Sequence, residues 1–259
     1  MIEKEGDSRD LQDDLKRLQE WNRKWQHKFN LDKCTVMHVG HKVATQYVMQ
    51  QDNQTWSLTA VTEERDLGVL VSNDLKVSRR CAESVKKASN VLRLIKRHFF
   101  KLDKSTFLIL YKCYVRPHLE YSVQAWSPLC RRISFVGSRC RGEQTKLVEG
   151  FKRLGYGTRL KELGLTTLEK QRLRGDLIET YKILTARERV KKEDFFQLRQ
   201  REYDLCGHQF SLEVKRSRIN IRSHFFSQRT VKHWNALPDH VLSATSVNNF
   251  KNCLDSCEE

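Results

Sequence analysis

Hydrophobic spacing at the start of the chain predicts one amphipathic helix followed by a small sheet. Over residues 10–29, apolar side chains recur at steps of three and four, which is typical of one face of an α-helix. They are Leu11, Leu15, Leu18, Trp21, Trp25 and Phe29. Loose alternation over residues 34–39, and further runs at 55–61 and 67–71, favour short strands. We therefore expect this helix to cover a small antiparallel sheet.

The next segment has the most regular helical pattern in the chain. Ser78 is expected as its N-cap, and its apolar positions are Cys81, Val85, Ala88, Leu92, Ile95 and Phe99. At about 100° per residue, one row of basic residues falls on the opposite face. This row consists of Arg79, Lys86, Arg93 and Arg97. A solvated polar face would have a similar pattern, but such faces usually mix both signs of charge, and Glu83 is the one acid here.

A second helix is expected from residues 103–105, with an apolar side formed by Phe107, Leu108, Tyr111, Tyr114 and Val115. Pro117 should kink or end it, because proline removes a backbone donor and clashes with the preceding turn. Leu119, Val123 and Trp126 continue the apolar stripe. Residues 131–149 have no helical or strand period, and we expect them to form an exposed, mobile loop.

The rest of the chain predicts a helix and then a small C-terminal subdomain. Thr166-Thr167-Leu168-Glu169 is a capping-box start for a helix that runs to about residue 186. Its buried stripe should be Leu173, Leu177, Tyr181 and Leu184. Residues 219–222 alternate apolar and polar side chains, aromatic residues follow, and a short helix is expected near Ser246.

The predicted fold class is thus α+β and mostly α. The expected division is a helix with a small sheet at 1–75, a helical bundle at 76–130, a flexible loop at 131–150, a helical connector at 151–200 and a C-terminal subdomain at 201–259.

Charge favours a polyanionic partner. The chain holds 48 Lys and Arg against 32 Asp and Glu, a formal net charge of +16, and residues 1–60 are balanced, so the whole excess lies beyond residue 60. Phosphates neutralised by Lys or Arg release condensed counterions, which favours nucleic acid as the partner. Composition alone does not separate DNA from RNA, nor does it exclude an anionic membrane surface.

The cysteines indicate a reduced, intracellular protein, nuclear or cytoplasmic and not secreted. None of the eight forms a C-x-x-C pair. Cys253-x-x-x-Cys257 lacks a following histidine and Cys206-Gly207-His208 lacks a second pair, so no metal site is predicted. The polar start of the chain is unlike a secretory signal, and no stretch of eighteen apolar residues predicts a membrane span.

A series of phrases carries a family resemblance. In order they include Phe29-Asn30-x-x-Lys33-Cys34, Asp66-Leu67-Gly68-Val69-x-Val71, Val115-Arg116-Pro117-x-Leu119-Glu120-Tyr121, Trp126-Ser127-Pro128, Leu163-Gly164-Leu165-x-x-Leu168-Glu169, Arg174-Gly175-Asp176-Leu177, Ile221-Arg222-x-His224-Phe225-Phe226 and Trp234-Asn235-x-Leu237-Pro238. The series resembles the C-terminal part of non-LTR retrotransposon reverse transcriptases of the LINE, jockey and CR1 kind. It covers nearly the whole chain except residues 131–150.

The resemblance implies a role for each segment. Lys33 matches the lysine of the palm, although a role is not expected for it without the metal site. Leu67, Gly68 and Val69 match the primer grip, so residues 1–75 correspond to the end of the palm. Residues 76–130 correspond to the thumb, which clamps the primer-template duplex. The basic row Arg79, Lys86, Arg93 and Arg97 suits phosphate contacts.

The departures from the family predict an inactive chain. The intact polymerases hold Mg²⁺ with paired aspartates that follow an aromatic and a small residue. Asp13-Asp14 follows Leu11-Gln12 instead and lies within a predicted helix, so we interpret the pair as solvent-facing. Without the catalytic aspartates, no catalytic residue and no cofactor are assigned. The hypothesis is a reverse-transcriptase fragment with residual, low-specificity binding of duplex or single-stranded nucleic acid. The alternatives are a domesticated protein-interaction module and a non-functional remnant, and the oligomeric state stays open.

Overall fold

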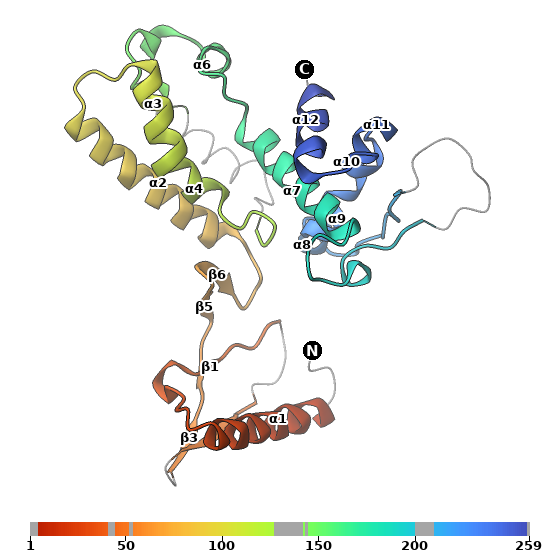
Figure 1. Ribbon diagram of the computed structural model, residues 1–259. Helices are drawn as coiled ribbons and strands as arrows, with labels where there is room; N and C mark the ends of the chain where they lie inside the picture. Colours follow the sequence, from red (N-terminus) through yellow and green to blue (C-terminus); the bar gives the residue numbers. More distant parts are fainter. Residues whose placement is uncertain are drawn as a thin grey trace. The chain divides into compact units, whose positions relative to one another are not determined.

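The computed structural model describes residues 5–40, 45–51, 54–126, 142, 145–199 and 210–257. The chain divides into two compact units, Met1–Lys76 and Val77–Glu259, and each is described by itself. Helices predominate and the strands are short (Figure 1), so the fold class is α+β and mostly α, as predicted.

The first unit combines one long helix with short strands that pair two by two. Helix α1, Glu5–Lys24, is followed by a 3-10 turn, η1, Leu31–Lys33. The strands are β1, Thr35–Val36; β2, Val48–Gln51; β3, Gln54–Ser57; β4, Thr59–Ala60; β5, Glu63–Asp66; and β6, Val69–Ser72. The β2–β3 and β5–β6 pairs are antiparallel, whereas β1 and β4 are parallel. The expectation of a single antiparallel sheet was therefore wrong.

Two of these strands escaped prediction because their residues are polar. Strand β5 reads Glu63-Glu64-Arg65-Asp66 and β2 ends on two glutamines, so neither shows the alternation that marks a half-buried strand. Strand β5 forms by pairing with β6 across a two-residue turn, with Asp66 opposite Val69. The predicted run at residues 67–71 accordingly begins in the turn, not in a strand.

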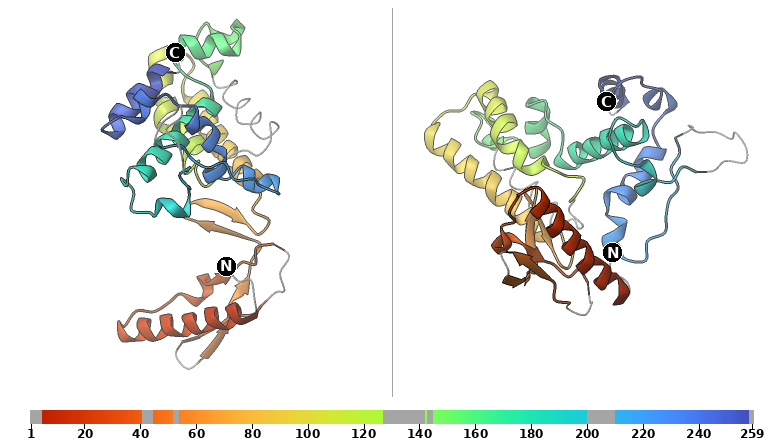
Figure 2. Two further views of the ribbon diagram at one scale, coloured as in Figure 1. Left: turned by 90° about the vertical axis from the view of Figure 1, so that its right-hand side faces the viewer. Right: turned by 60° about the horizontal axis from the view of Figure 1, so that its bottom comes forward.

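Helix α1 lies beside the strands of the first unit (Figures 1 and 2). It contacts β2 through amide side chains. The Gln12 side-chain nitrogen donates to the Val48 carbonyl at 2.8 Å, and the Val48 amide donates back to Gln12 Oε1 at 3.0 Å. Gln19 donates to the Gln50 carbonyl at 2.8 Å. The predicted apolar stripe does not cover the strands, because Leu11, Leu18, Trp21 and Trp25 are all exposed. The apolar period predicted the helix correctly, but the prediction that its apolar face covers the strands was wrong, because its polar side contacts β2.

A hydrogen-bonded turn closes the first unit after β6. The Ser72 hydroxyl donates to Asp74 Oδ1 at 2.7 Å, and the Lys76 amide donates to the same oxygen at 3.0 Å. Lys76 Nζ lies 3.1 Å from the other carboxylate oxygen. These donors, with that of Ser72 first, lower the pKa of Asp74 to about 2.

A carboxyl group with a lowered pKa in the folded state should stabilise the first unit at neutral pH. Its contribution is complete above the ordinary value of 3.8 and is lost as pH falls from there towards 2. We expect Asp74→Asn to lower the urea midpoint at pH 6 and to converge with the wild type near pH 2. The measurement is urea unfolding of both proteins across this range, and a gap that stays constant down to pH 2 would contradict the assignment.

The second unit begins with two adjacent helical runs. Helix α2, Ser78–His98, packs against the run formed by α3, Lys104–Leu110, the π-helical segment η2, Tyr111–Val115, and α4, Arg116–Glu120 (Figure 1). Their shared core holds Ala88, Ile95, Phe107, Tyr111, Val115 and Leu119. Helix α2 starts one residue after Val77, so Ser78 is its first residue and not the predicted N-cap.

Pro117 does not end the second run, which continues to Glu120. It lies in the first turn of α4, where the missing backbone donor is tolerated. The widened π-helical turn Tyr111–Val115 comes immediately before it, which accommodates the proline ring within a continuous run. Leu119, Val123 and Trp126 are buried, as the apolar stripe predicted, although the helix itself ends at Glu120.

The predicted loop at 131–150 lies mostly outside the described residues, but its end is packed. Val148 pairs with Leu102 and, like Thr145, is buried. Thr145 Oγ1 accepts a hydrogen bond at 2.8 Å from Arg159, which is itself buried. The exposure expected for these two positions was therefore wrong. The segment continues into η3, Phe151–Arg153, and α6, Tyr156–Glu162.

Helix α7, Leu168–Leu184, contributes to both cores of the second unit. Thr167 is its N-cap and accepts from the Lys170 amide, so the helix begins within the predicted segment but one residue later than a capping box of Thr166 and Glu169 would give. Leu177, Tyr181 and Leu184 are buried with aromatic residues of the C-terminal segment, chiefly Phe226, Trp234 and Phe250. That segment contains η4, Lys192–Asp194; α8, Asn220–Ser223; α9, Phe226–Arg229; α10, Val231–Asn235; α11, Asp239–Leu242; and α12, Val247–Cys257.

Candidate nucleic-acid interface

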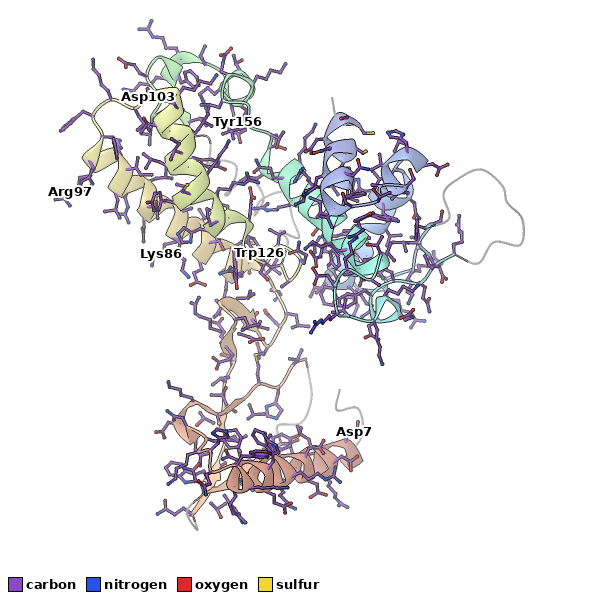
Figure 3. The ribbon with its side chains drawn as sticks, viewed as in Figure 1. Asp7, Lys86, Arg97, Asp103, Trp126 and Tyr156 are labelled. Atoms are coloured by element: carbon purple, nitrogen blue, oxygen red, sulfur yellow. The ribbon has the colours of Figure 1, made fainter. Side chains whose placement is uncertain are left out.

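The basic row on α2 is exposed along the whole helix. Arg79, Lys86, Arg93 and Arg97 are all exposed, while Cys81, Ala88 and Ile95 on the other side are buried. At about 100° per residue the four positions fall within roughly 40° of one another, and they span about 27 Å at 1.5 Å per residue. Figure 3 labels Lys86 and Arg97 on this helix. The result is one straight line of cations with the spacing to meet several phosphates.

A buried stack of three side chains fixes the start of α2. The guanidinium carbon of Arg80 lies 5.4 Å from the centre of the Trp126 ring, and that of Arg172 lies 5.6 Å from it. All three side chains are buried, and the Trp126 indole donates to the Tyr121 carbonyl at 2.8 Å. Burial lowers the pKa of Arg172, and nearby Cys81 and Glu120 oppose that shift. The stack ties α2 to α7, so the basic row is carried by a fixed helix.

The first turn of α2 carries charges that the helix macrodipole disfavours, whereas the cations of its last turn, Lys96, Arg97 and His98, are at the end that the macrodipole favours for them. Its first turn holds Arg79 and Arg80, although the helix macrodipole favours anions at this end. Glu83 lies 3.1 Å from Lys87 and 3.8 Å from Arg80. The negative charge of Glu83 is therefore paired with neighbouring cations that lie beside the basic row.

The loop between α2 and α3 adds residues that sequence reasoning missed. Phe99 was predicted to be buried, but the helix ends at His98, and Phe99 and Phe100 are 41% and 102% exposed. Lys101 is also exposed. The sequence feature that could have indicated these exposed residues is the pair of adjacent phenylalanines at the end of the predicted helix. Exposed aromatic rings beside cations can stack on unpaired bases. This loop therefore adds candidate base-stacking positions at the end of the basic row.

The residues that resemble palm elements belong to the first unit. Lys33 is exposed at the end of η1. Leu67 and Gly68 form the β5–β6 turn with φ of 43° and 78°, and Val69 is buried. Positive φ at both central positions is the type I′ hairpin geometry, which suits Gly68 but is unusual for leucine. Leu67 is also 83% exposed, so an apolar side chain is held outward on a strained backbone position.

Asp13 and Asp14 are solvent-facing carboxylates of α1, as interpreted. Asp13 lies 2.8 Å from Lys16, and Asp14 lies 3.1 Å from Arg17, each one turn along the helix. The hydrogen bond from Lys16 lowers the pKa of Asp13. Among the described residues, no three His, Cys, Asp or Glu side chains are placed to hold a metal ion. In the same part of the chain, no helix has the length and apolar character needed to cross a membrane.

The structure groups the predicted site residues into two sets. Lys33, Leu67, Gly68 and Val69 belong to the unit Met1–Lys76, and the basic row belongs to the unit Val77–Glu259. Comparison of the chain with protein-family models, with curated proteins and with solved structures gives no match.

Proposed function

We propose that the chain binds nucleic acid through the basic face of α2, with low sequence specificity. The observation that carries this proposal is the line of Arg79, Lys86, Arg93 and Arg97 on a helix whose other face is buried. The net charge of +16 supports it, because the excess of cations lies in the part of the chain that contains this helix. The partner is an RNA or DNA duplex or a single strand.

Binding of labelled duplexes tests the proposal directly. Fluorescence anisotropy of the full chain with two duplexes of unrelated sequence should give similar affinities that fall steeply with salt. Equal affinity for both sequences is expected because contacts to phosphate carry no sequence information. Absence of binding at about 50 mM salt, where phosphate contacts are strongest, would refute the function.

We further propose that the chain is a fragment with reverse-transcriptase ancestry and without polymerase activity. The ordered series of phrases supports the ancestry, including Leu67-Gly68-Val69 and Arg174-Gly175-Asp176-Leu177. The setting of Asp13 and Asp14 supports inactivity, because both carboxylates are exposed on a helix and each has a cation within 3.1 Å, which opposes the binding of a metal ion.

Purified protein is accordingly expected to extend no primer on RNA or DNA templates with Mg²⁺ or Mn²⁺. Nucleotidyl transfer needs carboxylates that hold two metal ions about 4 Å apart. The measurement is incorporation of labelled nucleotide. Incorporation that disappears on Asp13→Ala or Asp14→Ala would show that these residues form a metal site after all.

A protein-interaction module is the second candidate function. The specific observation in its favour is the exposed apolar stripe of α1. This surface lies in the first unit, whereas the basic row lies in the second, so the two functions are compatible and separately testable.

A further inference from the structure

One face of α1 is apolar and exposed. Leu11, Leu18, Trp21 and Trp25 are 38%, 44%, 52% and 59% exposed. At about 100° per residue they fall within roughly 80° of the helix surface, and they run for about 21 Å along it. The side that meets β2 carries Gln12 and Gln19 instead. We call the four residues the α1 apolar face.

Charge is divided unevenly along the same helix. The first half is mainly acidic, with Asp7, Asp10, Asp13 and Asp14, and the second half with its extension is mainly basic, with Arg17, Arg23, Lys24 and Lys28. Lys16 adds to the basic half, and the exceptions are Arg9 in the first half and Glu20 in the second. Asp10, Arg17 and Lys24 are exposed and, by helical spacing, lie along one edge of the α1 apolar face, whereas the exposed Asp14 lies within the face, between Leu18 and Trp21.

We propose that the α1 apolar face is where a second copy of the chain docks, with the two α1 helices antiparallel. A two-fold axis beside Leu18 brings that residue against its own copy and Leu11 against Trp25 of the second copy. The arrangement is isologous, because the same patch is used on both sides. It covers all four apolar side chains with apolar partners, which a monomer leaves in water.

Charge selects this orientation. With Leu18 on the axis, Asp10 and Asp14 of one copy lie beside Lys24 of the other, since opposite ends of the helices meet. A parallel pair would place the two acidic halves together and the two basic halves together. Repulsion between these like charges disfavours the parallel arrangement. Arg17 lies close to the axis and is already paired with Asp14 of its own helix at 3.1 Å.

The same charges disfavour a polynucleotide on this face. Asp10 and Asp14 border the apolar side chains and would repel phosphates, even though exposed tryptophans alone could stack on bases. A second copy satisfies both halves of the helix at once. The face is short compared with a standard interface, so we expect a dissociation constant on the order of 10 µM.

Sedimentation equilibrium of the nuclease-treated full chain tests the proposal. Between about 0.5 and 200 µM, the mass should rise from that of the 30.7 kDa chain towards twice that value. Leu18→Glu places two carboxylates at the axis and should weaken association at least about tenfold. Leu94→Glu is the matched control, since Leu94 is 57% exposed on α2, and it should leave association unchanged. Circular dichroism checks that each variant is folded.

Charge reversal tests the orientation independently of Leu18. Asp10→Lys with Asp14→Lys should weaken self-association, whereas Asp13→Lys with Glu20→Lys, at exposed positions away from the face, should not. Adding Arg17→Glu and Lys24→Glu to the first pair reverses the polarity of the helix. The reversed protein should associate with itself and exclude the wild type. In an antiparallel pair of one wild-type and one reversed chain, helix halves of like charge would face each other, whereas in a parallel pair halves of opposite charge would meet.

Several results would overturn the proposal. A wild type that stays monomeric over the whole range contradicts it, as does a reversed protein that pairs preferentially with the wild type. Oligonucleotide binding that quenches tryptophan emission and is lost on Trp21→Leu with Trp25→Leu would assign the face to a polynucleotide instead. The first two outcomes are independent of the basic row of α2, because self-association is measured without nucleic acid.

Discussion

Replacing Arg79, Lys86, Arg93 and Arg97 together by Gln is expected to lower the slope of log affinity against log salt by about 3 to 4. Each phosphate contact with duplex DNA contributes about 0.9 to this slope, because each displaces condensed counterions. The helix should survive, since all four side chains are exposed and Gln is a good helix former. The measurement is an anisotropy titration of wild type and variant at several salt concentrations.

A matched variant separates this face from general charge. Lys152, Arg153, Lys161 and Lys170 are also exposed in the second unit, but they lie on η3, α6 and α7. Their replacement by Gln removes the same charge and should change the slope by less than about 1. If both variants lose the same slope, or if the α2 variant loses none, the line of cations on α2 has no special role in binding.

The helices that the sequence predicts well are those whose signals are local. The start of α7 follows from Thr167, whose hydroxyl satisfies an amide one turn ahead, and this chemistry needs no distant partner. The outward row on α2 follows from steps of seven and four on a helix with a strong apolar side. Both features could be placed from sequence because spacing alone determines them.

Contacts between elements that are distant in the sequence were harder to predict. The period of Leu11, Leu18 and Trp25 identified an apolar helix face, but nothing in the period says what covers it, and β2 is instead met by Gln12 and Gln19. Strand β5 has no alternation to detect, because its pairing is set by the turn at Leu67 and Gly68. Local pattern fixes the element, whereas its neighbour depends on residues elsewhere in the chain.

The candidate site shows the same division. Each cation of the basic row was identified from the sequence. The stack that anchors their helix was not, because Arg80, Trp126 and Arg172 are far apart in the sequence. The exposure of Phe99 followed from the helix ending one residue earlier than its apolar period indicated. Helix ends are set by competition among backbone groups and are weakly coded by hydrophobic spacing.

An ion pair between the buried Asp176 and the partly buried Arg229 connects three segments of the second unit. Arg229 donates from Nε to Asp176 Oδ2 at 2.8 Å and from a terminal nitrogen to Oδ1 at 2.9 Å. Its other hydrogen bonds reach the carbonyls of His224, at 2.9 Å, and Val123, at 2.8 Å. One guanidinium thus joins α7 and α9 to the turn that follows α4.

We expect Asp176→Asn to lower the free energy of unfolding of this unit by about 3 to 5 kcal/mol. The side-chain size is kept, but the Arg229 cation, whose side chain is 15% exposed, then lacks its counter-charge. Urea unfolding is the measurement. The buried Trp126 and Trp234 lie in this unit and report on its loss, whereas Trp21 and Trp25 of the other unit are exposed.

The reverse variant, Arg229→Met, should be destabilised to a degree that depends on pH. Burial raises the pKa of Asp176, and the hydrogen bond from Arg229 opposes that shift, so removing Arg229 raises the pKa further. Below the ordinary value of 3.8 the carboxyl is protonated in both states, and the deficit is smallest. As pH rises, the unfolded chain ionises first, so stability falls until the folded pKa is passed.

The double variant Asp176→Leu with Arg229→Met completes the test. Apolar replacement of a buried ion pair is often neutral, so it should recover most of the stability that either single change removes. Its urea midpoint should also lose the pH dependence of Arg229→Met, because no buried carboxyl is left to titrate. Additive losses in the double variant, or a loss of under about 1 kcal/mol in Asp176→Asn, would show that the pair behaves as an exposed surface salt bridge.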